Sequence, residues 1–173
     1  MTHAYADLAT IQATDPGDIL TAAWCDQVRA NEEVLVDPPA CSVYNSSAVS
    51  LSNDTATVLN ADTENYDNDS MHSTVTNTSR ITIQTAGRYL LTAAVGFAAN
   101  ATGNRSIEFK LNGVALSGGT LLASSGSTNS TAIVLTRTLV LAAADYVEVT
   151  ATQRSGGALN TTLSEFAALF LTR

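Results

Sequence analysis

Positive charge is scarce in this chain, because eight Lys and Arg stand against sixteen Asp and Glu and the net charge is −8. So few cations cannot neutralise a track of phosphates or hold the chain on anionic lipid, which excludes nucleic acid and membrane surfaces as main partners. No run of about eighteen apolar residues is present, and residues 1–18 lack the basic and apolar regions of a signal peptide. We therefore expect a soluble protein that is made in the cytoplasm.

Cysteine is also rare, and the usual catalytic motifs are missing. Cys25 and Cys41 are the only cysteines, no CxxC is present and no histidine lies near them, so zinc and redox chemistry have little support. We expect both thiols to stay reduced, although the sequence leaves open whether they pair. There is no G-x-S-x-G or phosphate-binding glycine pattern, and His72 has no neighbours that would orient it for catalysis. The sequence predicts no catalytic residue, no cofactor and no metal ion.

The chain divides at the "DPPAC" stretch, residues 37–41, where two prolines separate two kinds of sequence. Residues 1–40 contain one helical segment, and from 41–173 the residues are β-branched, alternating and punctuated by Gly, Asn and Ser. A length of 173 residues suits one medium domain with an appendage. We predict a helical arm over 1–40 and an all-β domain over 41–173.

The arm carries an apolar stripe within residues 17–35, and Thr21 can cap its helix. An apolar stripe without an evident internal partner indicates an interaction surface. Because the β domain does not obviously need this stripe, we expect the domain to fold without the arm and the arm to bind another protein. The stripe consists of Leu20, Trp24, Val28 and Leu35.

Apolar and polar residues alternate in three segments of the β domain, which predicts strands that are buried on one side only. The Gly- and Ser-rich residues 117–131 are predicted to form a surface loop. The three alternating segments are residues 79–84, 106–111 and 146–151.

Two further predicted strands, residues 88–99 and 165–172, are apolar on both faces. The outer faces of an antiparallel sandwich are normally in water, so such strands need a second cover. A packed helix could provide it, but only one helix of useful length is present. We therefore favour a partner subunit as the cover.

These residues resemble the trimeric jelly roll of the complement-head and tumour-necrosis-factor superfamily, and more closely the version found in bacteriophage virion proteins. The resemblance covers about residues 42–173. It rests on "DTENYDNDSMH", "SRITIQTAGRYLLTAAVGFAANATGNR", a Lys-Leu-Asn-Gly turn, "LVLAAADYVEV" and "EFAALFLT". The chain departs from it at "AAAD", residues 142–145, where such domains often have a glycine before the aspartate. Residues 15–35 also resemble a segment of tailed-phage structural proteins.

The acidic stretch over residues 62–72 has three possible interpretations. Its carboxylates, Asp62, Glu64, Asp67 and Asp69, suit calcium chemically, but the glycine and distal glutamate of the helix-loop-helix calcium site are missing. A catalytic pair would need a cleft that shifts one pKa, whereas this loop is polar. The resemblance favours a third interpretation, an acidic segment of the fold with Tyr66 packed inward and the acids outward. Calcium binding by Asp62 to Asp69 is left open.

The resemblance implies an antiparallel jelly-roll sandwich that assembles as a homotrimer, with a short N-terminal helical arm. We predict a threefold axis lined by strands 89–98 and 166–171, and we assign the apolar stripe of the arm to virion attachment. The predicted interface residues are Tyr89, Leu91, Val95, Phe97, Phe166, Leu169, Phe170 and Leu171.

A trimeric sandwich without an assembled active site is suited to binding and to covering a surface. We predict a non-enzymatic phage structural protein that is made in the host cytoplasm and built into the virion. Its short arm favours a capsid decoration protein bound to the major capsid protein, since a fibre would need a long shaft. A receptor-binding tip attached to tail proteins is the alternative, with 117–131 meeting the host, and a virion carbohydrate-active enzyme is a third hypothesis.

Overall fold

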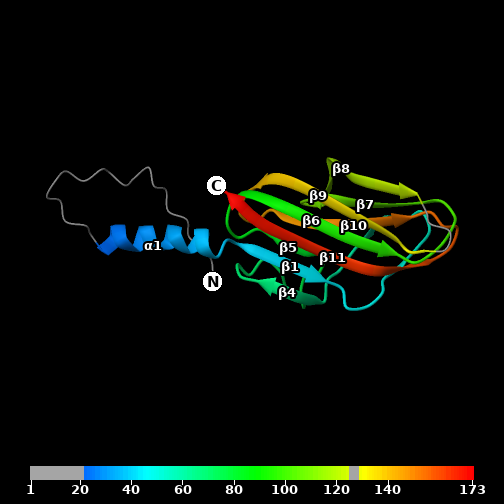
Figure 1. Cartoon of the computed structure of the whole chain (residues 1–173), viewed down its shortest axis with the longest axis horizontal. Coiled ribbons are helices and arrows are strands. Elements are labelled where there is room, and N and C mark those ends of the chain that lie inside the picture. The colour runs from blue at the N-terminus through cyan, green and yellow to red at the C-terminus, as the bar shows by residue number, and fades with distance from the viewer. Residues whose placement is uncertain (1–21, 125–128) are drawn as a thin grey trace.

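The computed structural model describes residues 22–124 and 129–173, which form one helix and eleven strands (Figure 1). Among these residues, no helix is long and apolar enough to span a membrane. The elements are α1 (Ala22–Val36), β1 (Ala40–Tyr44), β2 (Ser50–Leu51), β3 (Thr57–Val58), β4 (Thr63–Asp67), β5 (Arg80–Thr82), β6 (Gly87–Phe97), β7 (Asn104–Leu111), β8 (Val114–Ser124), β9 (Thr131–Leu141), β10 (Tyr146–Gln153) and β11 (Leu159–Thr172).

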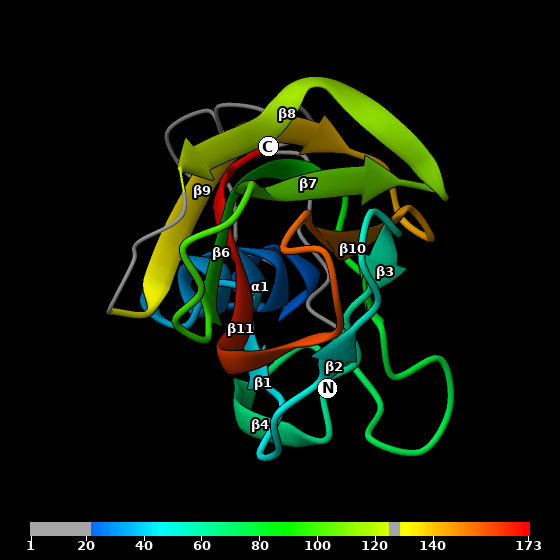
Figure 2. The same cartoon turned by 90° about the vertical axis from the view of Figure 1, so that its right-hand side faces the viewer.

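The strands build two antiparallel sheets that pack face to face. The six-stranded sheet has the order β4-β1-β11-β6-β9, and β2 adds to β11. The five-stranded sheet has the order β3-β10-β7-β8, and β5 adds to β10. An end-on view shows the two sheets as separate layers, with β9, β6, β11 and β1 in one layer and β8, β7 and β10 in the other (Figure 2). The predicted fold class, an antiparallel sandwich with a short helix, is confirmed.

The core lies between the sheets and takes one row of side chains from each long strand. Edge-to-face packing of Tyr89 on Phe170, with ring centroids 5.5 Å apart, and tilted packing of Phe109 on Phe166 at 5.8 Å, join β6 and β7 to β11. The Tyr89 hydroxyl donates a hydrogen bond of 2.6 Å to the Thr85 carbonyl, so its one polar atom is satisfied.

This packing corrects most of the predicted trimer interface. Six of its eight side chains are buried within a single protomer, because the inward row of an alternating strand fills the protomer's own core. Leu169 and Leu171 are the two that point outward and are exposed. The six core residues are Tyr89, Leu91, Val95, Phe97, Phe166 and Phe170.

The predicted loop over 117–131 is wrong for its first half. Asn112 and Gly113 both have positive φ, 51° and 79°, and form a two-residue hairpin turn in which Leu111 pairs with Val114. This register carries β8 alongside β7 as far as the pair Asn104 and Ser124, so residues 117–124 are strand. A tight turn therefore overrides the loop-like composition of the segment.

Residues 142–145, where the chain departs from the sequence pattern of the resembling domains, form a single turn. Ala144 has a φ of 71°, a conformation in which glycine is favoured because it has no Cβ. The turn is held by the Asp145 carboxylate, which accepts a hydrogen bond of 2.8 Å from the Ala142 amide, and by the Ala144 amide, which donates to the Ile83 carbonyl. The surrounding hydrogen bonds thus offset the strain of placing alanine there.

Helix α1 projects from one end of the sandwich, along its long axis (Figure 1). Its junction with β1 is fixed by Asn68, whose side-chain amide donates to Asp37 Oδ1 and to the Pro38 carbonyl and whose Oδ1 accepts from the Ala40 amide at 2.6 Å. The last turn of the helix also contributes Val34, which is 3 % exposed, to the core cluster. The last turn of the helix is therefore packed against the β domain.

The apolar stripe of the arm is described in part, and its role in attachment stays a prediction. Leu35 is 78 % exposed, and the neighbouring Val34 is buried in its place because Val34 faces the end of the sandwich. Trp24 and Val28 are half-buried, and Leu20 lies outside the described residues. The boundary predicted between residues 40 and 41 falls at the first residue of β1.

We expect Gly87→Ala to lower the free energy of unfolding by about 1–3 kcal/mol, the usual cost of overpacking a core. A Cβ at Gly87 would overlap the Phe170 ring and lie 2.8 Å from the Thr172 carbonyl oxygen. Chemical denaturation measures the change, and Gly157→Ala is the control, because a Cβ there meets open space. A neutral Gly87→Ala would contradict the tight contact between β6 and β11.

Candidate interaction surface

The acidic stretch folds as β4 and a following turn, and its side chains hold backbone groups. Asp67 accepts hydrogen bonds from the amides of Met71 and His72, at 2.9 and 2.8 Å. Asp62 accepts from the amide and the hydroxyl of Ser46, at 2.8 and 2.7 Å, and these bonds lower the pKa of Asp62 below its ordinary value. These two carboxylates therefore fix loops of the fold.

Two details of the predicted arrangement of this stretch are wrong. Tyr66 is exposed, because it pairs with Ser42 on the outward side of the sheet, and Asp69 is fully buried. Burial raises the pKa of Tyr89, and the negative charge of Asp69 raises it further. The stretch thus places one acid inside and its aromatic residue outside.

No group of three or more His, Cys, Asp or Glu within residues 22–124 and 129–173 is arranged to hold a metal ion. The two thiols are free and lie in different environments, since Cys25 is exposed and Cys41 is buried. Burial, followed by the charges of Asp67 and Glu64, raises the pKa of the Cys41 thiol far above its ordinary value. Cys41 is therefore a core residue that stays protonated.

His72 also has a structural role. Its Nδ1 lies 2.9 Å from the Arg80 carbonyl oxygen, which can only accept, so Nδ1 carries the proton. The contact joins the turn after β4 to β5. No serine and carboxylate are aligned with this ring by any hydrogen bond of the described residues.

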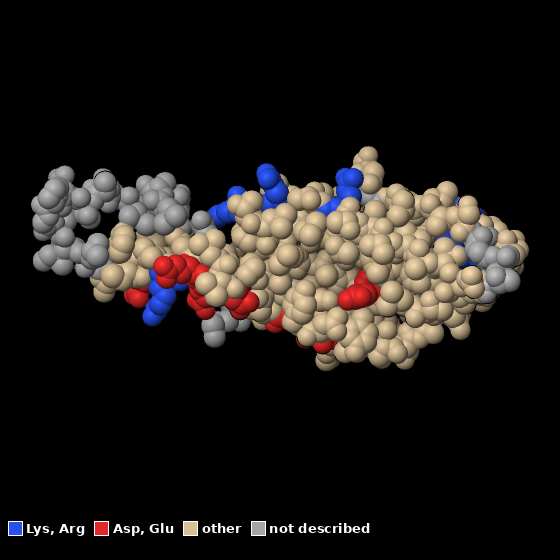
Figure 3. Space-filling view, in the orientation of Figure 1, with Lys and Arg blue, Asp and Glu red and all other residues tan. Residues whose placement is uncertain are grey.

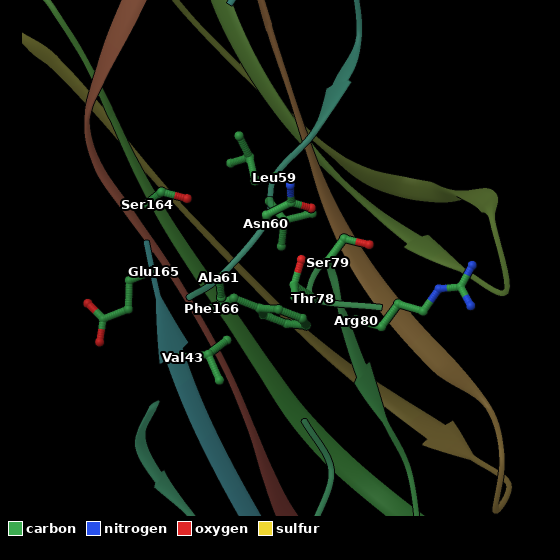
Figure 4. Close-up of a pocket in the computed structure, with 11 residues that line it drawn as sticks. Val43, Leu59, Asn60, Ala61, Thr78, Ser79, Arg80, Ser164, Glu165 and Phe166 are labelled. Carbon is green, nitrogen blue, oxygen red and sulfur yellow. The ribbon is translucent and has the colours of Figure 1, made fainter. Parts of the chain in front are cut away.

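A crevice opens at the side of the sandwich between the two sheets (Figure 4). Val43, Leu59 and Phe166 form its apolar part, while Glu165 and Arg80 lie at opposite sides with their charged ends directed away from it. Its volume of about 10 Å³ holds at most one water molecule. The crevice is too small for a substrate and has no facing pair of carboxylates.

The outer face of the six-stranded sheet is the most distinctive surface of the described chain. Over β9, β6 and β11 its outward side chains are small or apolar, and only Arg88 and Glu165 are charged. A space-filling view onto this sheet shows mostly uncharged residues over the β strands (Figure 3). The face consists of Ala132, Val134, Thr136, Thr138 and Val140 of β9, Arg88, Leu90, Thr92 and Ala94 of β6, and Glu165, Ala167, Leu169 and Leu171 of β11.

The outward residues of the five-stranded sheet differ sharply from this face. There Glu148 accepts hydrogen bonds from Ser79 and Arg80, at 2.9 and 3.1 Å, and the Arg80 guanidinium stacks over Tyr146 at 3.9 Å. Thr120 donates to Glu108 at 2.8 Å on the same side. Paired charges of this kind are absent from the outer face that β9, β6 and β11 form, although Glu148 itself is largely covered by its partners.

Sequence reasoning missed the part of this face that β9 contributes. Residues 131–141 alternate in burial with period two, but apolar residues occupy both phases, Ile133 and Leu135 in one and Val134 in the other, so the sequence does not separate an inner from an outer row. The register with β6 settles the phase, since Val134 pairs with Ala94 and Val140 with Arg88.

Comparison with solved structures shows the fold of the chain. The globular domain of zebrafish complement 1qA is 15 % identical, with a TM-score of 0.59 over 78 % of this chain and 98 % of that one. Murine APRIL is 13 % identical, with a TM-score of 0.59 over 77 % of this chain and 98 % of that one. The Eiger TNF of S. frugiperda is 15 % identical, with a TM-score of 0.55 over 78 % of this chain and 94 % of that one. No protein-family model and no curated protein sequence matches the chain.

The predicted resemblance to the complement-head and tumour-necrosis-factor jelly roll is therefore confirmed as a fold. None of these three structures comes from a bacteriophage, so the virion assignment stays a prediction. Because their sequence identity to this chain is low, these structures establish its fold and do not indicate its partners.

We expect Asp67→Ala to lower the free energy of unfolding by about 1–2 kcal/mol, because it leaves the Met71 and His72 amides without their acceptor. Thermal and chemical unfolding measure the change, with Glu64→Ala as the control, since Glu64 is exposed. The loss should be equal with and without millimolar calcium. A loss that appears only with calcium present would support the metal interpretation instead.

Proposed function

We propose that this chain is a non-enzymatic structural protein of a bacteriophage virion, a homotrimer that decorates the capsid. The single observation that supports assembly most strongly is the contrast between the two sheets. One sheet turns paired charges outward, and the other turns outward a broad face whose only charges are Arg88 and Glu165. An extended uncharged face of this kind is typical of a protein–protein contact.

A second copy of the chain is the cover that fits this face. The alternative was a helix packed on the sheet, but α1 projects from the end of the sandwich and does not lie over β6 or β9 (Figure 1). No other helix is present in residues 22–124 and 129–173. The face is thus left for a partner.

Three copies are favoured by the resemblance of the sequence to trimeric jelly rolls, and the fold that this resemblance implied is confirmed. Cyclic symmetry closes such an assembly without leaving a free face. A trimer also matches the local threefold positions of a capsid lattice. A decoration protein needs both properties, because it covers a repeated surface and must not polymerise.

Attachment to the major capsid protein is assigned to the helical arm. Trp24 and Val28 keep part of their surface accessible on α1, and Leu20 belongs to the same predicted stripe. We do not assign Leu35 to the attachment surface, because Leu35 lines a hollow at the end of the sandwich together with Leu171. A short arm that is rigidly joined to the β domain suits a protein seated directly on a shell.

Electron microscopy of virions labelled with an antibody to this protein tests the proposed role. Label on the head supports decoration. Label confined to the tail would replace decoration with the receptor-binding alternative, and virions without label would refute a virion role altogether.

We expect Leu169→Asp to break the trimer into monomers, because it buries a carboxylate without a partner in the apolar interface. Light scattering coupled to size-exclusion chromatography measures the mass. Leu122→Asp is the matched control, since Leu122 is also exposed but lies on the outer side of the five-stranded sheet. An unmutated chain that is a folded monomer at micromolar concentration would refute the trimer.

We expect Trp24→Ala to lower the occupancy of the protein on virions while the melting temperature of the free trimer stays within about two degrees. An aromatic anchor in a partner groove contributes ~2 kcal/mol or more per copy, and three copies act together. Binding to stripped capsids measures occupancy, and Arg29→Ala is a control at an exposed position of the same helix. A strongly destabilised trimer, or normal occupancy, would refute the anchor.

A further inference from the structure

A hollow of about 180 Å³ lies at the end of the sandwich where α1 joins it. Val34 and Leu35 of the helix and Phe170 and Leu171 of β11 form its apolar part, and polar groups line the rest. An apolar cavity of ~150 Å³ accepts benzene, so this space is ample for a branched aliphatic side chain. The other lining residues are Pro38, Thr172 and Arg173.

Leu35 is the unusual member of this lining. It is 78 % exposed, although its neighbours Val34 and Phe170 are almost completely buried. Asn68 ties Asp37 and Pro38, the residues that follow the helix, to the turn after β4. In this arrangement Leu35 leaves one side of the hollow open.

Val140, near the end of β9, is an apolar side chain that protrudes from the surface and is 74 % exposed. It lies at the same level as the hollow, because Val140 pairs with Arg88 of β6, and Arg88 pairs with Thr172 of β11. Both features belong to the six-stranded outer face or adjoin it. The Val140 side chain and the hollow therefore lie at the same level along the strands, on opposite sides of β6.

The Val140 side chain cannot fill the hollow of its own protomer. Strand β6 separates β9 from β11, and two strand spacings amount to ~10 Å between the backbones. Another copy can fill it, since a threefold axis along the strands keeps the level of each residue from one copy to the next. Different patches on the two sides of each contact make a head-to-tail interface, which closes into a ring when the rotation between copies is threefold.

We infer that Val140 of each protomer inserts into the hollow between Leu35 and Leu171 of its neighbour. This inference rests on the proposed trimer and specifies its contact at the end that carries α1. It gives Leu35 a role in assembly, and it makes the helix part of the trimer contact. The contact continues the six-stranded outer face onto the last turn of α1.

Disulfide cross-linking of the full-length chain tests this contact. In a Cys25→Ser background, we expect Val140→Cys with Leu171→Cys to give a covalently closed trimer on a non-reducing gel after mild oxidation. A disulfide needs Cα atoms within about 7 Å, so the pair cannot close inside one protomer, where β6 intervenes. Each single cysteine variant is a control and should give no covalent trimer.

The outcomes separate this inference from the proposed function. A double variant that elutes as a trimer but forms no cross-link overturns the Val140 contact and leaves the trimer standing. A covalent dimer from Val140→Cys alone overturns it in favour of a twofold contact. A double variant that is monomeric, when the unmutated chain is also monomeric, refutes the trimer itself.

A second variant keeps the test independent of cysteine chemistry. Val140→Asp should lower the fraction of trimer at least tenfold at micromolar concentration, because it replaces an apolar contact with Leu35 and Leu171 by a carboxylate that loses its water. Val114→Asp is the matched control, since Val114 is comparably exposed but lies at the hairpin of the five-stranded sheet. Equal trimer fractions in the two variants would overturn the inference.

Discussion

The structure depends on the packing of the inward rows of β6 and β11 against the five-stranded sheet. These two strands are neighbours in the centre of the six-stranded sheet, and their aromatic side chains reach the opposite layer. Because a strand has only two faces, filling the core with one row commits the other row to the outside. Since that second row is also largely apolar, the fold of one protomer itself creates the surface that calls for a partner.

At the end of the sandwich that carries the helix, polar side chains hold backbone groups in place. Asn68 ties the chain between α1 and β1, and Asp67 holds the turn that follows β4. Both act through backbone groups that would otherwise lie partly buried without partners, which is costly. The acidic stretch therefore secures the junction from which the helix leaves, and it links the fold to the attachment role proposed for that helix.

The sequence predicted the sandwich and several of its strands, because alternation in residues 106–111 and 146–151 separates apolar from polar faces. It could not predict the direction of Tyr89 or Phe170, since the rows on both sides of those strands are apolar. Helical spacing likewise cannot choose between Val34 and Leu35 when only the end of the sandwich decides which is covered. Strand β8 was missed because the Asn112 and Gly113 turn, rather than composition, sets its path.

The clamp at Asn68 also determines how mechanical load would pass through the molecule. Force applied to α1 is transmitted directly to β1. Strand β1 lies between β11 and β4 and is hydrogen-bonded to both in antiparallel ladders. Force along a strand shears all the hydrogen bonds of both ladders together, whereas force at the end of a ladder opens them one at a time. A chain held through this helix would thus resist detachment with several hydrogen bonds in parallel.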